Sequence, residues 1–150
     1  MKKLLLAVIV SLSSLTTVAL AEIKVGIILG FTGPIESLTP AMRDGAKLAF
    51  EEASNSGNLL GGERFKILEA DSTCVDAAAA TAAAEGLVAD GVVAIMGADC
   101  SGVTKAINAS VAVPNGIMMV SPSATSPALS SVPDNGSFWR TAPSDAKGVQ

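Results

Sequence analysis

The chain has 150 residues and a formal net charge of −4, and it contains neither histidine nor tyrosine. The acidic balance disfavours binding to nucleic acid and to anionic membrane surfaces. Without histidine the chain lacks the usual base for serine or cysteine nucleophiles and the commonest metal ligand, so we expect no enzyme, no metal site and no cofactor.

The N-terminus has the layout of a secretory signal peptide. Lys2 and Lys3 precede the apolar run LLLAVIV, and a polar segment then ends in the small residues ALA at 19–21. A membrane anchor is the alternative, but it needs about 20 apolar residues and this run is shorter. We therefore expect cleavage after Ala21, export to the periplasm, and a mature chain, residues 22–150, that does not insert into the membrane.

The start of the mature chain predicts a strand followed by a helix. Residues 23–29, IKVGIIL, form a nearly continuous apolar run rich in β-branched residues, which is typical of a strand covered on both faces. A loop with Gly and Pro follows at 30–37. Thr39 is placed to cap a helix whose first position is Pro40, and the segment 55–63 ends that helix.

The middle of the chain repeats this alternation. Residues 64–70, RFKILEA, predict a second strand, and the alanine-rich segment 76–90 predicts a second helix that packs small residues against the sheet. Low-complexity disorder is the alternative for this segment, but Leu87, Val88 and the flanking strands argue against it. Residues 92–96, VVAIM, predict a third strand.

The last part of the chain predicts one more helix and up to two strands. A helix over 101–112 leads to a fourth strand at 116–121. A long loop rich in Ser and Pro at 121–137 precedes a short candidate fifth strand at 138–142. Asp145 then opens a further helix, but the sequence stops without a C-terminal capping signal, so we expect a fragment of a longer protein.

The alternation of strands and helices predicts an α/β fold with a doubly wound parallel sheet and right-handed crossovers. Ligands of such sheets bind beyond the carboxyl ends of the strands. This rule brings four polar loops, GFTGP, DSTC, GADCSG and SPSATSP, to one edge. The first loop lacks the Gly-Lys-Ser/Thr ending of a phosphate loop, and it does not match the dinucleotide-binding fingerprint.

Two cysteines follow the second and third predicted strands. Cys74 and Cys100 would be close together if those strands are neighbours, and in an oxidising compartment a pair of cysteines first predicts a disulfide. A metal site is poorly supported, because two thiols without histidine or a CxxC spacing make an incomplete ligand set. A catalytic thiol lacks its imidazole. We therefore expect Cys74 and Cys100 to be bridged.

The polar side chains of this edge each have two interpretations. Ser101 is expected at the start of the third helix, where it can serve as an ordinary N-cap, bind an anion, or do both. Thr125 lies in a Ser/Pro loop that is either a simple turn or a stiffened binding loop. Asp99 is either a solvated charge, the commoner case, or a partner for a cationic or amide group. Cys100, beside Ser101, is included among the candidate ligand-binding residues.

Several segments together resemble a known family. The segments IKVGIILGFTGPIE, MRDGAKLAFEE, DSTC, MGADCSGVT, VSPSATSPAL and FWRTAPSD are similar to solute-binding proteins of branched-chain amino acid ABC transporters, the Leu/Ile/Val-binding group of the type I periplasmic binding fold. The resemblance covers essentially the whole mature chain. It implies two α/β lobes that close around a small ligand, with residues 22–150 forming a truncated N-terminal lobe and the second lobe absent.

The resemblance also implies roles for individual residues. Residues at the positions of Ser101, Ser123 (through its carbonyl) and Thr125 hold the α-carboxylate and α-ammonium groups of the ligand in amino-acid-binding members, and the two cysteines are bridged in those members. Leu38 departs from the pattern, because the aliphatic amino acid binders carry an aromatic residue there. Asp99 stands where they carry an apolar residue. Leucine, isoleucine and valine are therefore not assigned as the ligand.

The sequence thus predicts an extracytoplasmic protein that delivers a small carboxylate-bearing solute, an amino acid or a related compound, to an ABC permease. One alternative is a ligand-binding ectodomain or partner of a sensor, and another is a binder of amides, urea or aromatic acids. An enzyme of flavodoxin-like architecture is a third class. The lack of histidine, of a phosphate loop and of a nucleophile elbow argues against it.

Overall fold

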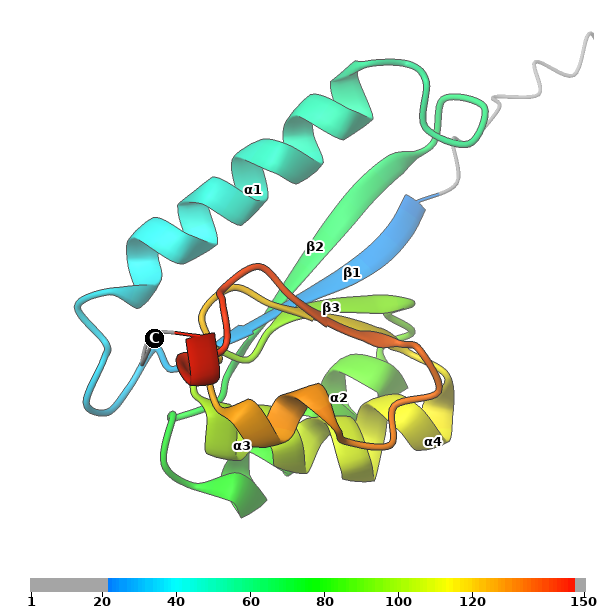
Figure 1. Ribbon diagram of the computed structural model, residues 1–150. Helices are drawn as coiled ribbons and strands as arrows, with labels where there is room; N and C mark the ends of the chain where they lie inside the picture. Colours follow the sequence, from blue (N-terminus) through cyan, green and yellow to red (C-terminus); the bar gives the residue numbers. More distant parts are fainter. Residues whose placement is uncertain (1–21, 148–150) are drawn as a thin grey trace, which may run out of the picture.

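The computed structural model describes residues 22–147, which form a five-stranded sheet in the order β2-β1-β3-β4-β5 with helices on both faces (Figure 1). All neighbouring strands are parallel, so the predicted doubly wound α/β fold is confirmed. The strands are β1 (Glu22–Leu29), β2 (Arg64–Asp71), β3 (Ala94–Gly97), β4 (Met118–Ser121) and β5 (Phe138–Arg140). The predicted signal peptide and its cleavage site lie outside the described residues.

The helices follow the predicted order. They are α1 (Thr39–Asn55), α2 (Ala77–Ala89), α3 (Ser101–Ile107) and α4 (Val113–Asn115), with a π-helical turn at Asn108–Ala112 and 3-10 turns at Pro127–Ser130 and Asp145–Lys147. Helix α3, the π-helical turn and α4 follow one another without a break and form one helical segment, which is three residues longer than the predicted helix. It ends at Gly116, whose φ of 65° is a left-handed conformation that glycine adopts without strain.

Several predicted boundaries are wrong by about two residues. The strands β3 and β4 begin later than expected, at Ala94 and Met118, because the N–H groups of Val92 and Ile117 still donate to carbonyls of the preceding helices. The last strand is shorter than expected and ends at Arg140. Val92 and Ile117 are both apolar, so the sequence pattern assigned them to the strands. Their N–H groups instead bond to carbonyls at the end of the preceding helix, which the pattern alone does not show.

The prediction that Thr39 caps α1 is also wrong. Leu38 occupies the N-cap position, and no side chain caps the helix. Thr39 is fully buried, and its hydroxyl faces the carbonyl oxygens of Gly30 and Glu36 at 3.3 and 3.2 Å. The hydroxyl therefore fastens the start of α1 to the loop that follows β1, with a proline in the first turn as predicted.

One face of the sheet packs against α2 and α3. Alanines at helical spacing, Ala80 and Ala84, are fully buried, as the prediction of small residues against the sheet requires. They belong to one core cluster with Ile28, Ile95 and Met119 from the three central strands. Small side chains on α2 let the helix lie close to β2 and β1, while parallel pairing brings the carboxyl ends of β1, β3 and β4 together.

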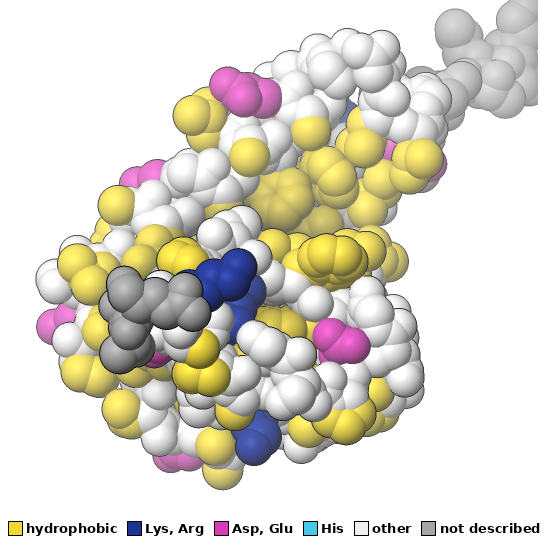
Figure 2. All heavy atoms as spheres, viewed as in Figure 1, with side chains coloured by type: hydrophobic (Ala, Val, Ile, Leu, Met, Phe, Trp, Pro, Cys, Tyr) yellow, Lys and Arg dark blue, Asp and Glu magenta, His cyan; other side chains and the backbone are white. Residues whose placement is uncertain are grey.

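The opposite face is covered unevenly. Ile27, Met96, Val120 and Trp139 form one cross-strand row on this face. Ile27 is fully buried on the side where α1 packs on β1 and β2, whereas Trp139 at the other end of the row is 62% exposed. Figure 2 shows hydrophobic side chains gathered on the surface beside α1. Within residues 22–147, no helix has the length and apolar character needed to cross a bilayer.

Candidate functional site

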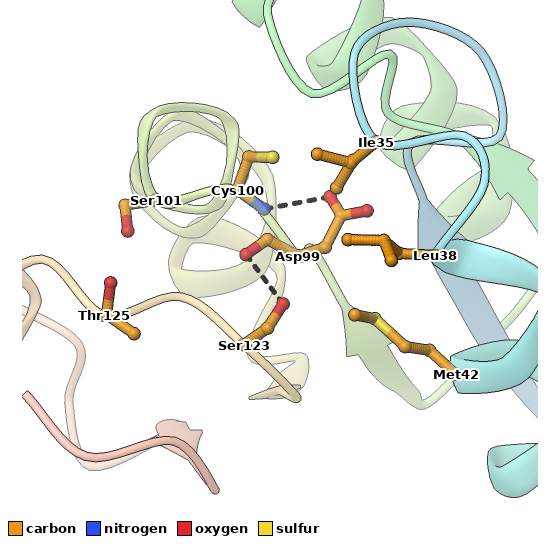
Figure 3. A pocket seen from close by; sticks show the side chains of 8 residues that line it. All are labelled: Ile35, Leu38, Met42, Asp99, Cys100, Ser101, Ser123 and Thr125. Atoms are coloured by element: carbon orange, nitrogen blue, oxygen red, sulfur yellow. Dashed lines mark hydrogen bonds between the residues drawn. The ribbon is translucent and has the colours of Figure 1, made fainter.

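A pocket of about 330 Å³ lies at the carboxyl edge of the sheet (Figure 3). It is lined by Ile35, Leu38, Met42, Asp99, Cys100, Ser101, Ser123 and Thr125. The structure thus brings together all six predicted ligand-binding residues, which come from three separate loops. Their role in binding a ligand stays a prediction.

The two sides of the pocket differ in chemistry. We call Ser101, Ser123 and Thr125 the hydroxyl wall, and Ile35, Leu38 and Met42 the apolar wall. Figure 3 shows the two walls facing each other, with Asp99 and Cys100 between them. The lining includes neither lysine nor arginine. A pocket of this kind suits a small molecule with a polar end and an apolar end.

Ser101 is the first residue of α3, as predicted, but its interpretation as the helix cap is wrong. Cys100 occupies the N-cap position, and no side chain caps α3. The Ser101 Oγ instead accepts a hydrogen bond from the Ser126 N–H at 3.1 Å. The helix starts one residue earlier than a serine cap requires, so the Ser101 hydroxyl points to the neighbouring loop and keeps its own proton available for a ligand.

The other two members of the hydroxyl wall lie in the loop after β4. The Ser123 Oγ donates to the carbonyl oxygen of Asp99 at 3.0 Å, while the Ser123 carbonyl accepts no hydrogen bond from the described residues. Thr125 Oγ1 has no hydrogen-bond partner within residues 22–147, although the Thr125 carbonyl accepts from the Asp145 N–H at 3.0 Å. The hydroxyl wall therefore offers two free hydroxyl protons and one free carbonyl.

Arg140 holds the loop that carries Thr125. Its guanidinium donates to the carbonyls of Ala124 and Ser126 at 3.3 and 2.8 Å, and to the Ser130 Oγ at 2.5 Å. The sequence predicted that prolines stiffen this loop. An arginine from β5, distant in sequence, contributes three further hydrogen bonds that no local pattern indicated.

The apolar wall comes from the loop after β1 and from the start of α1. Leu38 is 56% exposed and Ile35 is half-buried. We did not predict Ile35 or Met42 as lining residues. Met42 follows Leu38 by four positions, which places both on the same side of a helix and is the signal that could have found it.

Cys74 and Cys100 form the predicted disulfide, with their Cα atoms 5.2 Å apart. We expected the bridge to join the ends of neighbouring strands, and this is wrong because β1 lies between β2 and β3. In this doubly wound sheet, strands are added on both sides of the first strand, so β2 and β3 lie on opposite sides of β1. The bridge passes over the end of β1, where a Cβ at Gly30 would lie 3.2 Å from that of Cys74.

Asp99 is buried, with 3% of its surface exposed, so its interpretation as a solvated charge is wrong. Its Oδ2 accepts from the Gly30 N–H at 2.7 Å. Its Oδ1 accepts from the Cys100 N–H at 2.9 Å and from the Ser72 hydroxyl at 3.2 Å. The side chain faces inward because two amide donors and one hydroxyl donor from three strand ends converge there, so its partners belong to the protein itself.

A second carboxylate, Asp71, lies at the end of β2. Burial raises its pKa, but hydrogen bonds from the Thr32 hydroxyl at 2.6 Å and from the Thr73 and Thr32 N–H groups at 2.8 and 3.3 Å outweigh this, so the pKa is lowered overall. Asp71 thus holds the loop that leads to the apolar wall. Among residues 22–147 there is no group of three His, Cys, Asp or Glu residues placed to hold a metal ion.

Comparison with known proteins assigns the family. Residues 22–150 match the family model described as periplasmic binding protein. The chain belongs to this family. The Leu/Ile/Val-binding protein BraC3 of Rhizobium johnstonii is 32% identical over 127 residues, covering 85% of this chain and 34% of the relative. The Leu/Ile/Val-binding protein of Escherichia coli K12 is 32% identical over 128 residues, with the same coverage of both chains.

Solved structures agree with this assignment. The branched-chain amino acid transporter substrate binding protein LivJ from Streptococcus pneumoniae, in complex with isoleucine, matches with a TM-score of 0.72 and 27% identity, covering 84% of this chain and 35% of that one. A solute binding protein from R. palustris in complex with 4-hydroxybenzoate, 21% identical, shares the fold with a TM-score of 0.68, covering 83% of this chain and 32% of that one.

These findings confirm the predicted resemblance and fold class. The chain is a periplasmic binding protein of the type that includes the Leu/Ile/Val-binding proteins of ABC transporters, and it spans about a third of the length of the curated relatives that it matches. The relatives are named as binding proteins, not as enzymes. The division into a signal peptide at 1–21 and a lobe at 22–150 stays a prediction.

Proposed function

We propose that the protein is an extracytoplasmic solute-binding protein that delivers a small carboxylate-bearing solute, an amino acid or a related compound, to an ABC permease. One observation carries this proposal: a hydroxyl wall with unused hydrogen-bonding groups faces an apolar wall across a pocket, in a chain that belongs to the periplasmic binding protein family. Export depends on the predicted signal peptide, and delivery to a permease depends on the family.

The hydroxyl wall binds the polar end of the solute. The Ser101 and Thr125 hydroxyls have free protons that can donate to a carboxylate, and hydrogen bonds to charged groups are stronger than neutral ones. The free carbonyl of Ser123 can accept from an ammonium group. A zwitterionic amino acid has both groups on one carbon atom, so it satisfies all three positions at once.

The apolar wall contacts the rest of the solute. Leu38 and Met42 present only carbon and sulfur atoms to the pocket, so they favour a ligand whose remaining part is apolar. Leu38 is 56% exposed in this lobe, and tight sites bury roughly 70–90% of a ligand. A second lobe that closes over the pocket supplies the missing enclosure, as the two-lobe family architecture implies.

A thermal-shift screen of the full-length protein tests the proposal. The panel contains leucine, isoleucine, valine, 4-hydroxybenzoate, urea and a simple amide. A ligand that binds only the native state stabilises it by about 2.7 kcal/mol at 100 times its Kd, so we expect at least one carboxylate to raise the melting temperature by several degrees. A variant with Ser101→Ala and Thr125→Val should show a much smaller shift.

Four outcomes argue against the proposal. A shift with urea or the amide alone makes the protein a binder of neutral solutes. A shift that the double variant retains in full removes the hydroxyl wall from the binding site. Turnover of the added compound, followed by chromatography, makes the protein an enzyme. A transmembrane segment or a fused signalling domain in the full-length protein would assign it to a sensor.

A further inference from the structure

Asp99 is the one charged side chain that is buried among residues 22–147. Its carboxylate accepts hydrogen bonds from Gly30, Ser72 and Cys100, and its backbone carbonyl accepts from the Ser123 hydroxyl. Gly30 follows β1, Ser72 follows β2, Cys100 follows β3 and Ser123 follows β4. One residue is therefore hydrogen-bonded to segments at the ends of four neighbouring strands.

Two of these bonds fix where the pocket walls begin. Gly30 is the first residue of the loop that carries Ile35 and Leu38 of the apolar wall. Cys100 directly precedes Ser101 of the hydroxyl wall. The contact with Gly30 is close, since a Cβ on Gly30 would lie 3.3 Å from Oδ2 of Asp99. Asp99 directly precedes Cys100 in the chain, so its hydrogen bond to Gly30 connects the two walls, and its bond to the Cys100 N–H fixes the orientation of the carboxylate.

A buried carboxylate is costly unless hydrogen bonds replace its lost hydration. Its three donors meet this need and leave Asp99 little capacity to bind a ligand directly. We propose that Asp99 is a positioning residue that sets the separation of the hydroxyl wall and the apolar wall through the backbone amides of Gly30 and Cys100. The proposal rests on the proposed function only in taking the pocket as the ligand site.

Asparagine is the discriminating substitution at this position. It has nearly the shape of aspartate, but one of its two oxygens becomes an NH₂ group that can only donate. In either orientation, this NH₂ group faces a backbone N–H, that of Gly30 or that of Cys100. Asp99→Asn therefore removes one of these two hydrogen bonds without leaving a cavity, whereas the change would have little effect if the side chain only filled space.

Amide hydrogen exchange measured by NMR on the full-length protein without ligand is the test. We expect Asp99→Asn to speed exchange of the Gly30 amide or of the Cys100 amide, whichever faces the NH₂ group, by about tenfold or more, while amides of the central strands, such as Ile95, change less than about threefold. Asp71→Asn is the matched control. It makes the same chemical change at the end of β2 and should leave the Cys100 amide unchanged.

Leucine is the probe for the effect on binding. If wild type binds leucine in calorimetry, Asp99→Asn should weaken it by about tenfold or more at a temperature where the variant is fully folded. If wild type does not bind leucine, that result counts against leucine as the solute, and the exchange measurement alone decides the role of Asp99.

Two results overturn the positioning role. One is unchanged exchange at both amides in Asp99→Asn. The other is equal acceleration throughout the sheet, which shows a purely global loss of stability. Wild type gives a further test, should Asp99→Asn not fold. Its Gly30 and Cys100 amides must exchange at least about 100-fold more slowly than in an unstructured chain, and fast exchange at either one rejects the proposal.

Discussion

The two walls of the pocket are held in different ways. In the hydroxyl wall, the Ser101 and Ser123 hydroxyls are hydrogen-bonded to the backbone of neighbouring segments, and Arg140 holds the loop that carries Thr125. In the apolar wall, Leu38 is more than half exposed and its side chain has no polar group to fix it. Hydrogen bonds thus support the wall that is proposed to bind the polar end of a solute. No hydrogen bond fixes the Leu38 side chain in the wall that is proposed to face the rest of the solute.

Removal of the disulfide should give the largest effect in free energy, because the bridge holds Cys100, which lies between the two walls of the pocket. Cys74 and Cys100 are 26 residues apart, so a double change to Ser should lower the free energy of unfolding by about 3.5 kcal/mol in the chain-entropy model. Urea unfolding measures this loss. Reduced wild type serves as the control and should match the variant. Equal stability of oxidised wild type and the variant would contradict the prediction.

Loss of a hydroxyl should weaken ligand binding next most strongly. Ser101→Ala and Thr125→Val each remove a hydrogen bond to a charged group, about 1.5–3 kcal/mol, so affinity for a carboxylate ligand should fall by about one to two orders of magnitude. Calorimetry with the ligand found in the thermal screen measures this.

The control for these variants is Ser131→Ala, which removes an exposed hydroxyl after the same loop. It should bind like wild type. The effect should largely vanish for an uncharged analogue of the ligand, because the lost contact is specific to the carboxylate. Wild-type affinity in both pocket variants would show that these hydroxyls only support the loops.

A change in the apolar wall should alter preference more than strength. Leu38→Ala removes a partly exposed contact, so affinity for any one ligand should change by only about fivefold or less, while the order of preference among carboxylates changes. Leu48→Ala is the matched control, because Leu48 lies on α1 with the same 56% exposure and does not line the pocket. An unchanged order of preference in Leu38→Ala would remove Leu38 from the binding surface.

Acid should loosen the apolar side of the pocket slightly. The pKa of Asp71 is lowered in the folded state from its ordinary value of 3.8. The stabilisation that it provides is therefore complete above about pH 4 and is lost as pH falls through the lower folded pKa. Urea unfolding between pH 5 and pH 3 should show a slightly steeper loss for wild type than for Asp71→Asn. A parallel decline of both proteins would show that Asp71 contributes nothing.

The order of the elements and the position of the pocket were predictable, because local patterns determine both. Apolar β-branched runs predicted the strands, and the rule for parallel sheets brought Ser101, Ser123 and Thr125 to one edge. The position of β1 between β2 and β3 was not predictable in the same way, since strand order depends on contacts between distant segments.

The same limit explains the errors at single residues. Thr39, Ser101 and Asp99 each have polar groups that can bond locally, and the sequence pattern favoured local roles: a cap, a cap and a solvated charge. In the folded chain each is hydrogen-bonded to a residue at least nine positions away. Such bonds depend on which strand ends meet, and this information is absent from a short window of sequence.

The uneven cover of the second sheet face has an optical consequence. Trp139 is the single tryptophan of the chain, which also has no tyrosine, so its indole ring dominates the intrinsic fluorescence of this chain. Trp139 is 62% exposed on the face beside α1 and does not line the pocket. A shift of its emission to shorter wavelength therefore reports that something has covered this face, whereas a solute that enters the pocket without covering the face leaves the spectrum unchanged.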